Sequence, residues 1–226
     1  METKEPQYNI LFEIKEKHGV SRFGLMSNES WNQDPKRVLF LLARYKFVAK
    51  MLSGKENVLE IGCADAFGTR LVQQEVKNIT AIDFDPIFIN DAKERMNPHW
   101  PLEYYVHDML CGPFNNKFDG IYFLDVLEHI NPLYQDRFLS NAIQSLKENG
   151  VMIIGMPSLE SQVYASPQSK AGHVNCQSGA NLKKNLEKYF YNVFIFSMND
   201  EVVHTGFFPM AHYLLAVSCG LKNRGL

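Results

Sequence analysis

Apolar residues spaced three and four positions apart follow Asp34-Pro35 and predict the first long helix of the chain. Such spacing places one apolar face on a helix. Asp34 can cap the helix, Pro35 suits its first turn and Gly54 can end it. The apolar positions are Val38, Leu41, Leu42, Tyr45, Val48, Ala49 and Leu52.

Short apolar runs then alternate with segments of helical period. The predicted strands are residues 57–61, 79–82, 102–107, 120–124 and 151–156, and the predicted helices are 69–76, 86–96 and 132–147. Strands that are almost wholly apolar and separated by helices are typical of a parallel sheet covered on both faces. The pattern therefore predicts an α/β fold.

The two ends of the chain depart from this alternation. A predicted helix at 182–190 is followed by two strand candidates, 193–198 and 213–218, without a helix between them, which implies a terminal antiparallel pair. Residues 1–33 form an N-terminal appendage, a candidate cap, with one short helix predicted around Ile10, Leu11 and Ile14. We expect residues 34–226 to form the main domain.

Composition excludes several classes of protein. The chain has 226 residues, of which 46% are hydrophobic, and a net charge of −2 without a run of like charges, so a nucleic-acid partner is not expected. No apolar run approaches the ~20 residues that span a bilayer, and we expect no membrane contact and a cytoplasmic location. The four cysteines form no Cys-x-x-Cys pair, so neither a disulfide framework nor a metal site is expected.

The strongest functional signal is the run from Val58 to Gly68, in which a predicted strand leads into a turn of small residues and then a helix. Small residues at the end of a parallel strand let the backbone approach a ligand, and the helix N-terminus offers unpaired N–H groups. Its small residues are Gly62, Ala64, Ala66 and Gly68. We therefore expect a cofactor site here.

Asp83 ends the second predicted strand, about 20 residues beyond Gly62, where a carboxylate can accept both ribose hydroxyls of a nucleoside. Asp83 can alternatively cap the next helix, although Asp85 already supplies a cap. A dinucleotide site is disfavoured, because the turn lacks the G-x-G-x-x-G pattern. Asp119, at the start of its strand, is remote from this edge and is interpreted as structural.

Five motifs resemble those of class I S-adenosylmethionine-dependent methyltransferases, especially the small-molecule enzymes that include the ubiquinone-biosynthesis O-methyltransferases. They are VLEIGCADAFGT (58–69), AIDFDP (81–86), HDML (107–110), FDGIYFLDVLEHI (118–130) and LKENGVMIIGMPS (146–158). The resemblance covers about residues 45–218. It implies a Rossmann-like, seven-stranded, mostly parallel sheet with an antiparallel last strand, and S-adenosyl-L-methionine as cofactor.

The resemblance also implies roles for individual residues. Glu60 and Gly62 would lie by the methionine moiety, with Ala64 in the same turn; Asp83 would bind the ribose, Asp108 the adenine amino group, and Leu124 and Asp125 would border the transferred methyl.

Two further features of the cofactor site stay open in the sequence. Phe84 and Met109 can sandwich the adenine ring or belong to the core. Family members usually carry glycine at the positions of Ala64 and Ala66, so either the turn keeps φ below zero there or the cofactor sits differently.

His129 and His173 are the candidate catalytic bases. Methyl transfer to oxygen needs a group that removes a proton, and a neutral imidazole has a suitable pKa. His129 follows the fourth predicted strand, and His173 lies in a long segment of little periodicity, residues 158–178. The alternatives are a histidine that orients Glu128 within its loop and an exposed loop histidine.

The acceptor is less defined than the donor. We expect methyl transfer to oxygen of a small metabolite or sugar-linked intermediate; nitrogen or carbon acceptors and a non-catalytic cofactor-binding module remain alternatives. Arg37, Arg44 and Lys46 are interpreted as a solvated helix face, or as a partner for a substrate carboxylate or phosphate if the helix covers the acceptor pocket.

Overall fold

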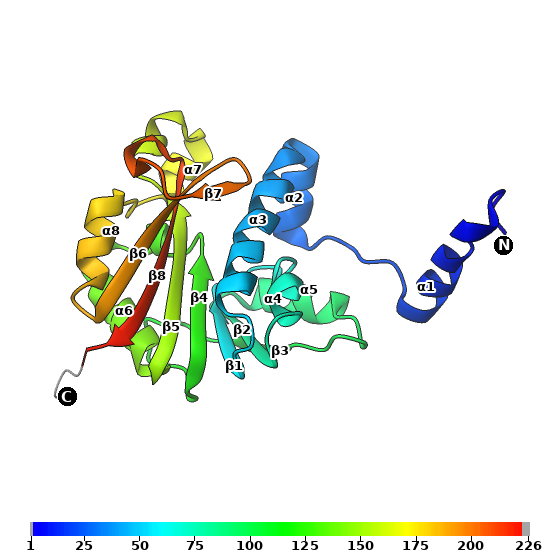
Figure 1. The fold of residues 1–226 in the computed structure, drawn as a ribbon, viewed down its shortest axis with the longest axis horizontal. Helices are drawn as coiled ribbons and strands as arrows, with labels where there is room; N and C mark the ends of the chain where they lie inside the picture. Colours follow the sequence, from blue (N-terminus) through cyan, green and yellow to red (C-terminus); the bar gives the residue numbers. More distant parts are fainter. Residues whose placement is uncertain (1, 223–226) are drawn as a thin grey trace.

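All strands belong to one eight-stranded sheet in the computed structural model, which describes residues 2–222 (Figure 1). The strand order is β3-β2-β1-β4-β5-β8-β6-β7. Its members are β1 (Asn57–Ile61), β2 (Asn78–Asp83), β3 (Glu103–Val106), β4 (Phe118–Leu124), β5 (Leu146–Pro157), β6 (Phe190–Asn199), β7 (Val202–His204) and β8 (Tyr213–Leu221).

Strands β1 to β5 pair in parallel, whereas β8 is antiparallel to both β5 and β6. The α/β class, the mostly parallel sheet and the antiparallel last strand are confirmed. The sheet has eight strands rather than the expected seven, because three-residue β7 pairs with the end of β6. A three-residue strand is too short for an alternation of apolar and polar residues to predict it.

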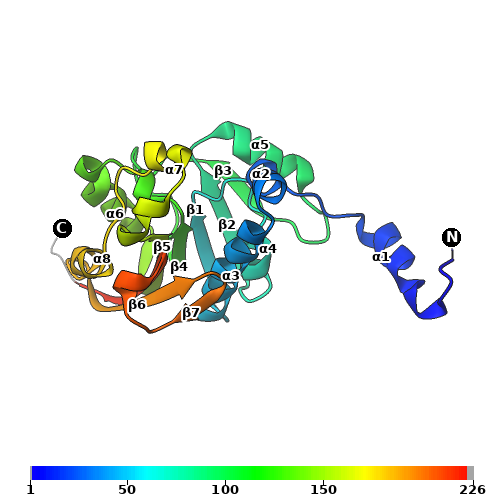
Figure 2. The same cartoon turned by 90° about the horizontal axis from the view of Figure 1, so that it is seen from above.

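Helices cover both faces of the sheet (Figures 1 and 2). On one face α3 (Lys36–Met51), α4 (Thr69–Gln73) and α5 (Pro86–Arg95) pack on the sheet, with Leu52 against Val58 and Tyr122 in one buried cluster. On the other face α6 (Gln135–Gln144) and α8 (Gly179–Leu186) place Leu139 and Leu182 over the sheet's second side. The core therefore consists of two apolar layers.

Several predicted boundaries were wrong. The helix predicted at 132–147 is a 3-10 turn, η3 (Pro132–Tyr134), followed by α6, and β5 already begins at Leu146, which pairs with Phe118. Ser178 caps α8 earlier than predicted, and Phe190 belongs to β6. The aperiodic segment 158–178 contains η4 (Glu160–Tyr164) and α7 (Pro167–Gly172).

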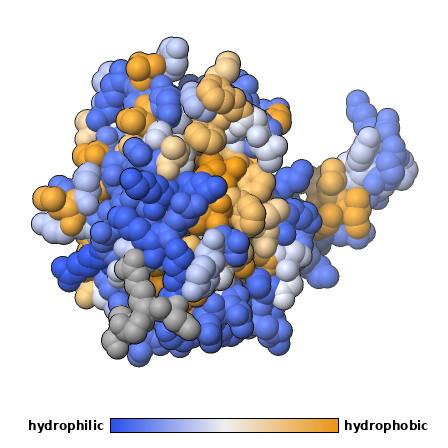
Figure 3. Space-filling view, turned by 60° about the vertical axis from the view of Figure 1, so that its left-hand side comes forward, coloured by the Kyte–Doolittle hydropathy of each residue, from blue (hydrophilic) through white to orange (hydrophobic). Residues whose placement is uncertain are grey.

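The N-terminal segment holds η1 (Pro6–Tyr8), the predicted short helix as α1 (Ile10–His18), and an unpredicted α2 (Leu25–Gln33). Helix α1 stands away from the main body, and Figure 3 shows exposed apolar side chains on this projecting part. They include Ile10, Leu11 and Ile14, each about half exposed. Within residues 2–222, no helix is long and apolar enough to cross a membrane.

The topology determines where a ligand can bind. Because β1 to β5 are parallel, their carboxyl ends meet at one edge of the sheet. The chain moves outward from β1 through β2 to β3 and then returns to β4 on the other side of β1. A crevice forms at such a switch point. Asp83 ends β2 at this edge, and Gly62, Asp108 and Asp125 follow β1, β3 and β4 there.

Truncation of Leu139 tests the packing of α6. Its side chain is 1% exposed, so Leu139→Ala should lower the free energy of unfolding by about 2–4 kcal/mol, measured by urea denaturation. Leu133→Ala is the matched control, because Leu133 is 85% exposed and its loss should cost less than about 0.5 kcal/mol. Equal losses would contradict the placement of α6 on the sheet.

Candidate functional site

The turn after β1 adopts a left-handed backbone at alternate residues. The φ angles are 71° at Gly62, 44° at Ala64 and 52° at Ala66, so the option that the alanines keep φ below zero is wrong. A Cβ on Gly62 would lie 2.4 Å from Cγ2 of Val126. Glycine is thus required at residue 62 for both conformation and space, whereas both alanines are strained.

A buried carboxylate fastens two helices to β1 beneath this turn. Glu60 is 2% exposed and accepts hydrogen bonds from Oη of Tyr45 in α3 at 2.6 Å and Oγ1 of Thr69 in α4 at 2.5 Å. Burial raises the pKa of Glu60 to about 7, although these hydroxyl donors oppose the shift. Tyr45 was assigned only to the core from its helical period, and nothing in the sequence signals its bond to Glu60.

The turn also holds the N-terminal segment. The Asp65 carboxylate accepts from the backbone N–H of Ser27 at 2.7 Å and from its hydroxyl at 3.2 Å. Nη2 of Arg95 in α5 donates to the backbone carbonyl of Asp65 at 2.6 Å. Helix α2 therefore lies directly against the predicted cofactor turn, a contact between distant segments that the sequence does not reveal.

Asp83 ties the turn to β2. Its carboxylate accepts from the backbone N–H groups of Ala64 and Asp85, each at 2.9 Å, and is 5% exposed. Asp85 caps α5 by accepting from Ile87, so the cap alternative for Asp83 is not needed. Each Asp83 oxygen makes one of these bonds and keeps acceptor capacity for a ligand.

The residues predicted around the adenine have different environments. Asp108 accepts from the Leu110 N–H at 2.8 Å through one oxygen, and its other oxygen accepts from the Cys111 thiol, a weak donor, at 3.7 Å. Phe84 is 71% exposed, whereas Met109 is 2% exposed and packs in the core. The core alternative therefore describes the Met109 side chain, and only the Phe84 ring is open to a ligand.

Arg44 enters the site from α3. Its Nη1 lies 2.6 Å from Oδ2 of Asp125, and its guanidinium lies 3.8 Å from the ring centroid of Tyr213. The solvated-face interpretation is wrong for Arg44, because its side chain is only 19% exposed. It holds for Arg37, half exposed and 3.6 Å from Glu29. Asp125 itself has a φ of 56° and follows Leu124 at the end of β4.

The structure brings together the two histidines predicted separately. His129 belongs to a 3-10 turn, η2 (Leu127–His129), and His173 ends α7; their ring centroids lie 5.2 Å apart. Nδ1 of His129 lies 2.9 Å from the Gly172 carbonyl, and Nδ1 of His173 lies 2.9 Å from Oε1 of Gln162. His173 is therefore anchored rather than free in an exposed loop, and burial lowers its pKa, as does the neighbouring His129.

Glu128 lies between these histidines and the core. It is fully buried, and its backbone carbonyl accepts from the N–H groups of Val174 and Asn175. Among residues 2–222, neither carboxylate oxygen has a hydrogen-bond partner. Burial raises the pKa of Glu128 well above its usual range, and the nearby Asp125 adds to the shift.

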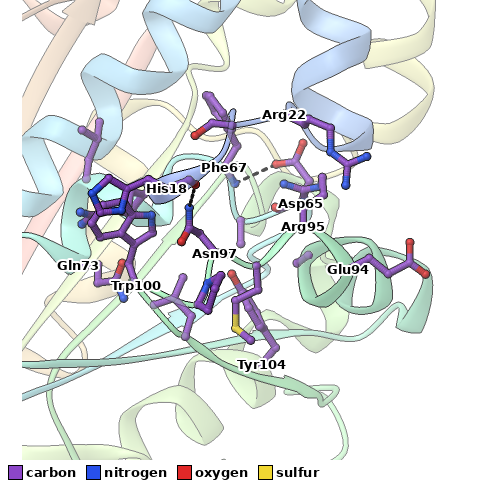
Figure 4. A pocket seen from close by; sticks show the side chains of 18 of the residues that line it. His18, Arg22, Asp65, Phe67, Gln73, Glu94, Arg95, Asn97, Trp100 and Tyr104 are labelled. Carbon is purple, nitrogen blue, oxygen red and sulfur yellow. Dashed lines mark hydrogen bonds between the residues drawn. The ribbon is translucent and has the colours of Figure 1, made fainter. Parts of the chain in front are cut away.

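A cavity of about 530 Å³ lies beside the turn after β1 (Figure 4). Asp65, Ala66 and Phe67 line it together with side chains of the 18–22 segment and of residues 94–104, including Trp100. Asp83, Asp108 and Asp125 do not line it. This cavity therefore adjoins the predicted cofactor site but is distinct from the carboxyl edge.

Comparison with known proteins agrees with this geometry. A family model described as a methyltransferase domain matches residues 31–193. The chain belongs to this family. Its sheet and helices have the Rossmann-like fold that solved methyltransferases share.

Its curated relatives differ in what they are named for. The ubiquinone biosynthesis O-methyltransferase of Rickettsia canadensis is 23% identical over 164 residues, 66% of each chain. Nodulation protein S of Azorhizobium caulinodans is 30% identical over 102 residues, which cover 45% of this chain and 49% of that protein. The chain thus matches slightly less than two thirds of the length of the Rickettsia enzyme.

The fold is shared with solved structures of low identity. The N-methyltransferase NodS from Bradyrhizobium japonicum WM9, in complex with S-adenosyl-L-homocysteine, has a TM-score of 0.60 and 21% identity, covering 84% of this chain and 90% of that chain.

Glycine at either strained alanine should stabilise the protein. Ala64→Gly or Ala66→Gly relieves the left-handed penalty but loosens the unfolded chain, so we expect a net gain of about 0.5–1 kcal/mol in thermal denaturation. Ala180→Gly in α8 is the control: it replaces an exposed helical alanine and should cost about 0.5–1 kcal/mol. Destabilisation by both turn variants would show that the turn does not hold left-handed residues.

Proposed function

We propose that this enzyme transfers the methyl group of S-adenosylmethionine to an oxygen atom of a small metabolite or sugar-linked intermediate. The observation that carries the proposal is the pair of anchored imidazoles, His129 and His173, beside Asp125 at the edge of the sheet that also carries the cofactor turn. An oxygen acceptor must lose its proton, and an imidazole can take it.

The chain's own residues fit the cofactor. The left-handed turn at Gly62, Ala64 and Ala66 exposes backbone where a ligand must approach closely. Asp83 and Asp108 keep acceptor capacity for the ribose hydroxyls and the adenine amino group, and the exposed ring of Phe84 can stack on adenine. Met109 can line this region only from within the core.

The methionine end would then lie over β1 and β4. Gly62 gives it room, Leu124 and Asp125 border the methyl, and Glu60 positions the turn from beneath through its bonds to Tyr45 and Thr69. Since the sulfonium donor is already activated, the enzyme chiefly has to align donor and acceptor at reacting distance. Arg44 holds Asp125 in place at this point.

The imidazoles supply the remaining chemistry. In both, Nδ1 lies against an oxygen acceptor, so Nδ1 carries the proton and donates, and Nε2 keeps its lone pair. A neutral imidazole with a free Nε2 can accept the proton of a hydroxyl as the methyl is transferred. Burial and the neighbouring His129 lower the pKa of His173, which favours the neutral form of that ring.

A nitrogen acceptor is the second candidate, because the relatives include nodulation protein S and a NodS N-methyltransferase as well as the ubiquinone O-methyltransferases. Turnover with paired hydroxyl and amine acceptors separates these candidates, and its absence with all of them would favour a cofactor-binding module.

The boundary between an N-terminal appendage and the main domain at residue 34 stays a prediction, as does the cytoplasmic location.

Removal of the Asp83 carboxylate should weaken the cofactor complex. We expect Asp83→Ala to cost about 1.5–3 kcal/mol of S-adenosylmethionine binding, the range for hydrogen bonds to a charged group, in calorimetric titration. Asp119→Ala is the matched control: Asp119 bonds to Asn57 and Lys147 at the opposite end of the strands, so cofactor affinity should not change. Unchanged affinity in a folded Asp83→Ala protein would contradict the ribose assignment.

Loss of the histidines should affect turnover rather than cofactor affinity. General-base catalysis contributes about 10²–10⁴-fold, so either His129→Ala or His173→Ala should reduce kcat by that factor, with S-adenosylmethionine affinity nearly intact. His99→Ala is the control. His99 lies against the Lys17 carbonyl of the N-terminal segment, so its loss should leave kcat unchanged. If even the double variant loses less than tenfold, neither histidine serves the acceptor.

A further inference from the structure

Three side chains with metal-binding atoms converge at the edge of the sheet. One ligand atom from each of Glu128, His129 and His173 lies within 4.8 Å of the others. Glu128 and His129 come from η2, directly after β4, and His173 comes from the end of α7. Hydrogen bonds from Val174 and Asn175 to the Glu128 carbonyl join the two segments.

The Glu128 carboxylate lacks the partners that burial requires. It is fully buried, and neither oxygen has a hydrogen-bond partner in the described part of the chain. An unpaired buried carboxylate costs several kcal/mol unless a counter-charge or a proton compensates it. Arg44, whose charge acts on Glu128, is already paired with Asp125. This carboxylate therefore has full capacity to bind a cation.

Hydrogen bonds fix both imidazoles with Nε2 available. The Gly172 carbonyl can only accept, so Nδ1 of His129 must donate to it. The amide nitrogen of Gln162 donates to the Ser158 carbonyl and to Oγ of Ser161, which establishes that its oxygen faces His173. Metal-binding histidines usually donate their second ring N–H to an oxygen in this way.

We propose that Glu128, His129 and His173 bind one divalent transition-metal ion. Two imidazoles and one carboxylate suit Mn²⁺, Co²⁺ or Zn²⁺ better than Mg²⁺, which prefers oxygen ligands. The predicted absence of a metal site considered only cysteine spacing, and this site contains no cysteine. Three protein ligands do not fill the coordination shell of such an ion. Solvent or substrate can reach the remaining positions, because His129 is exposed and His173 is partly exposed.

The place of the ion near Asp125 suggests that it acts on the methyl acceptor, an inference that rests on the proposed function. Asp125, which borders the methyl in that proposal, lies three residues before Glu128. A hydroxyl bound to the ion would be more acidic and would release its proton to solvent water, so the ion would perform the task otherwise assigned to an imidazole base. The loss of turnover in the histidine variants is expected in either case, and only metal binding separates the two roles.

Titration of tag-free, chelator-treated protein with Co²⁺ tests the site without any methyl acceptor. We expect one ion per chain by calorimetry, with visible absorption from the bound cobalt. Loss of a residue that hydrogen-bonds to a metal-binding histidine typically lowers metal affinity about 10–100-fold. Gln162→Ala should fall in this range, and loss of a direct ligand in His173→Ala or Glu128→Gln should cost at least about 100-fold.

His99→Ala is the matched control, because His99 and His18 form a second imidazole pair with centroids 4.4 Å apart. Cobalt binding that is absent, that survives in both His173→Ala and Glu128→Gln, or that is lost in His99→Ala would overturn the proposal. So would Mg²⁺ competing as strongly as Zn²⁺. S-adenosylmethionine titration of the same samples keeps the two proposals distinguishable: cobalt binding without cofactor binding would contradict only the methyltransferase mechanism.

Discussion

The site depends on a buried carboxylate inside a parallel sheet. Glu60 has almost no exposed surface, and the hydroxyls of Tyr45 and Thr69 satisfy it. These bonds fix α3 and α4 relative to β1, and thereby fix the turn between β1 and α4. Because the turn lies where the strand order reverses, it faces the crevice formed by the carboxyl ends of the neighbouring strands.

The proposed ligand site has two ends, which different strands supply. In that proposal Asp83, which ends β2, and Asp108, which follows β3, would lie on the nucleoside side. Asp125, Glu128 and the two histidines, which follow β4 and β5, would lie on the acceptor side. The Arg44–Asp125 pair and the Ser27–Asp65 bonds then connect the N-terminal helices to both sides. Helices α2 and α3 therefore help to form the site, although their sequences do not predict these contacts.

The sequence predicts the fold well where the signal is local. Strand ends, the small-residue turn and the place of Asp83 at a strand end are each defined by a few consecutive residues, and their order along the chain implies a shared edge, whereas their roles towards a cofactor stay predictions. It failed where the signal is a long-range pairing: Arg44 and Asp125 are 81 residues apart, and Ser27 and Asp65 are 38 apart. The left-handed alanines were also undecided, since tertiary packing overrides the preference of alanine. Glu128 was considered only as a loop neighbour of His129, because its burial, which makes it unusual, cannot be read from a single residue.

A crystal structure of the protein with S-adenosyl-L-homocysteine tests the central claim most directly. We expect the ribose at Asp83, the adenine beside Asp108 and Phe84, and the sulfur directed past Asp125 towards His129 and His173. Binding in the cavity of about 530 Å³ beneath residues 18–22, or a sulfur directed away from the two histidines, would contradict it.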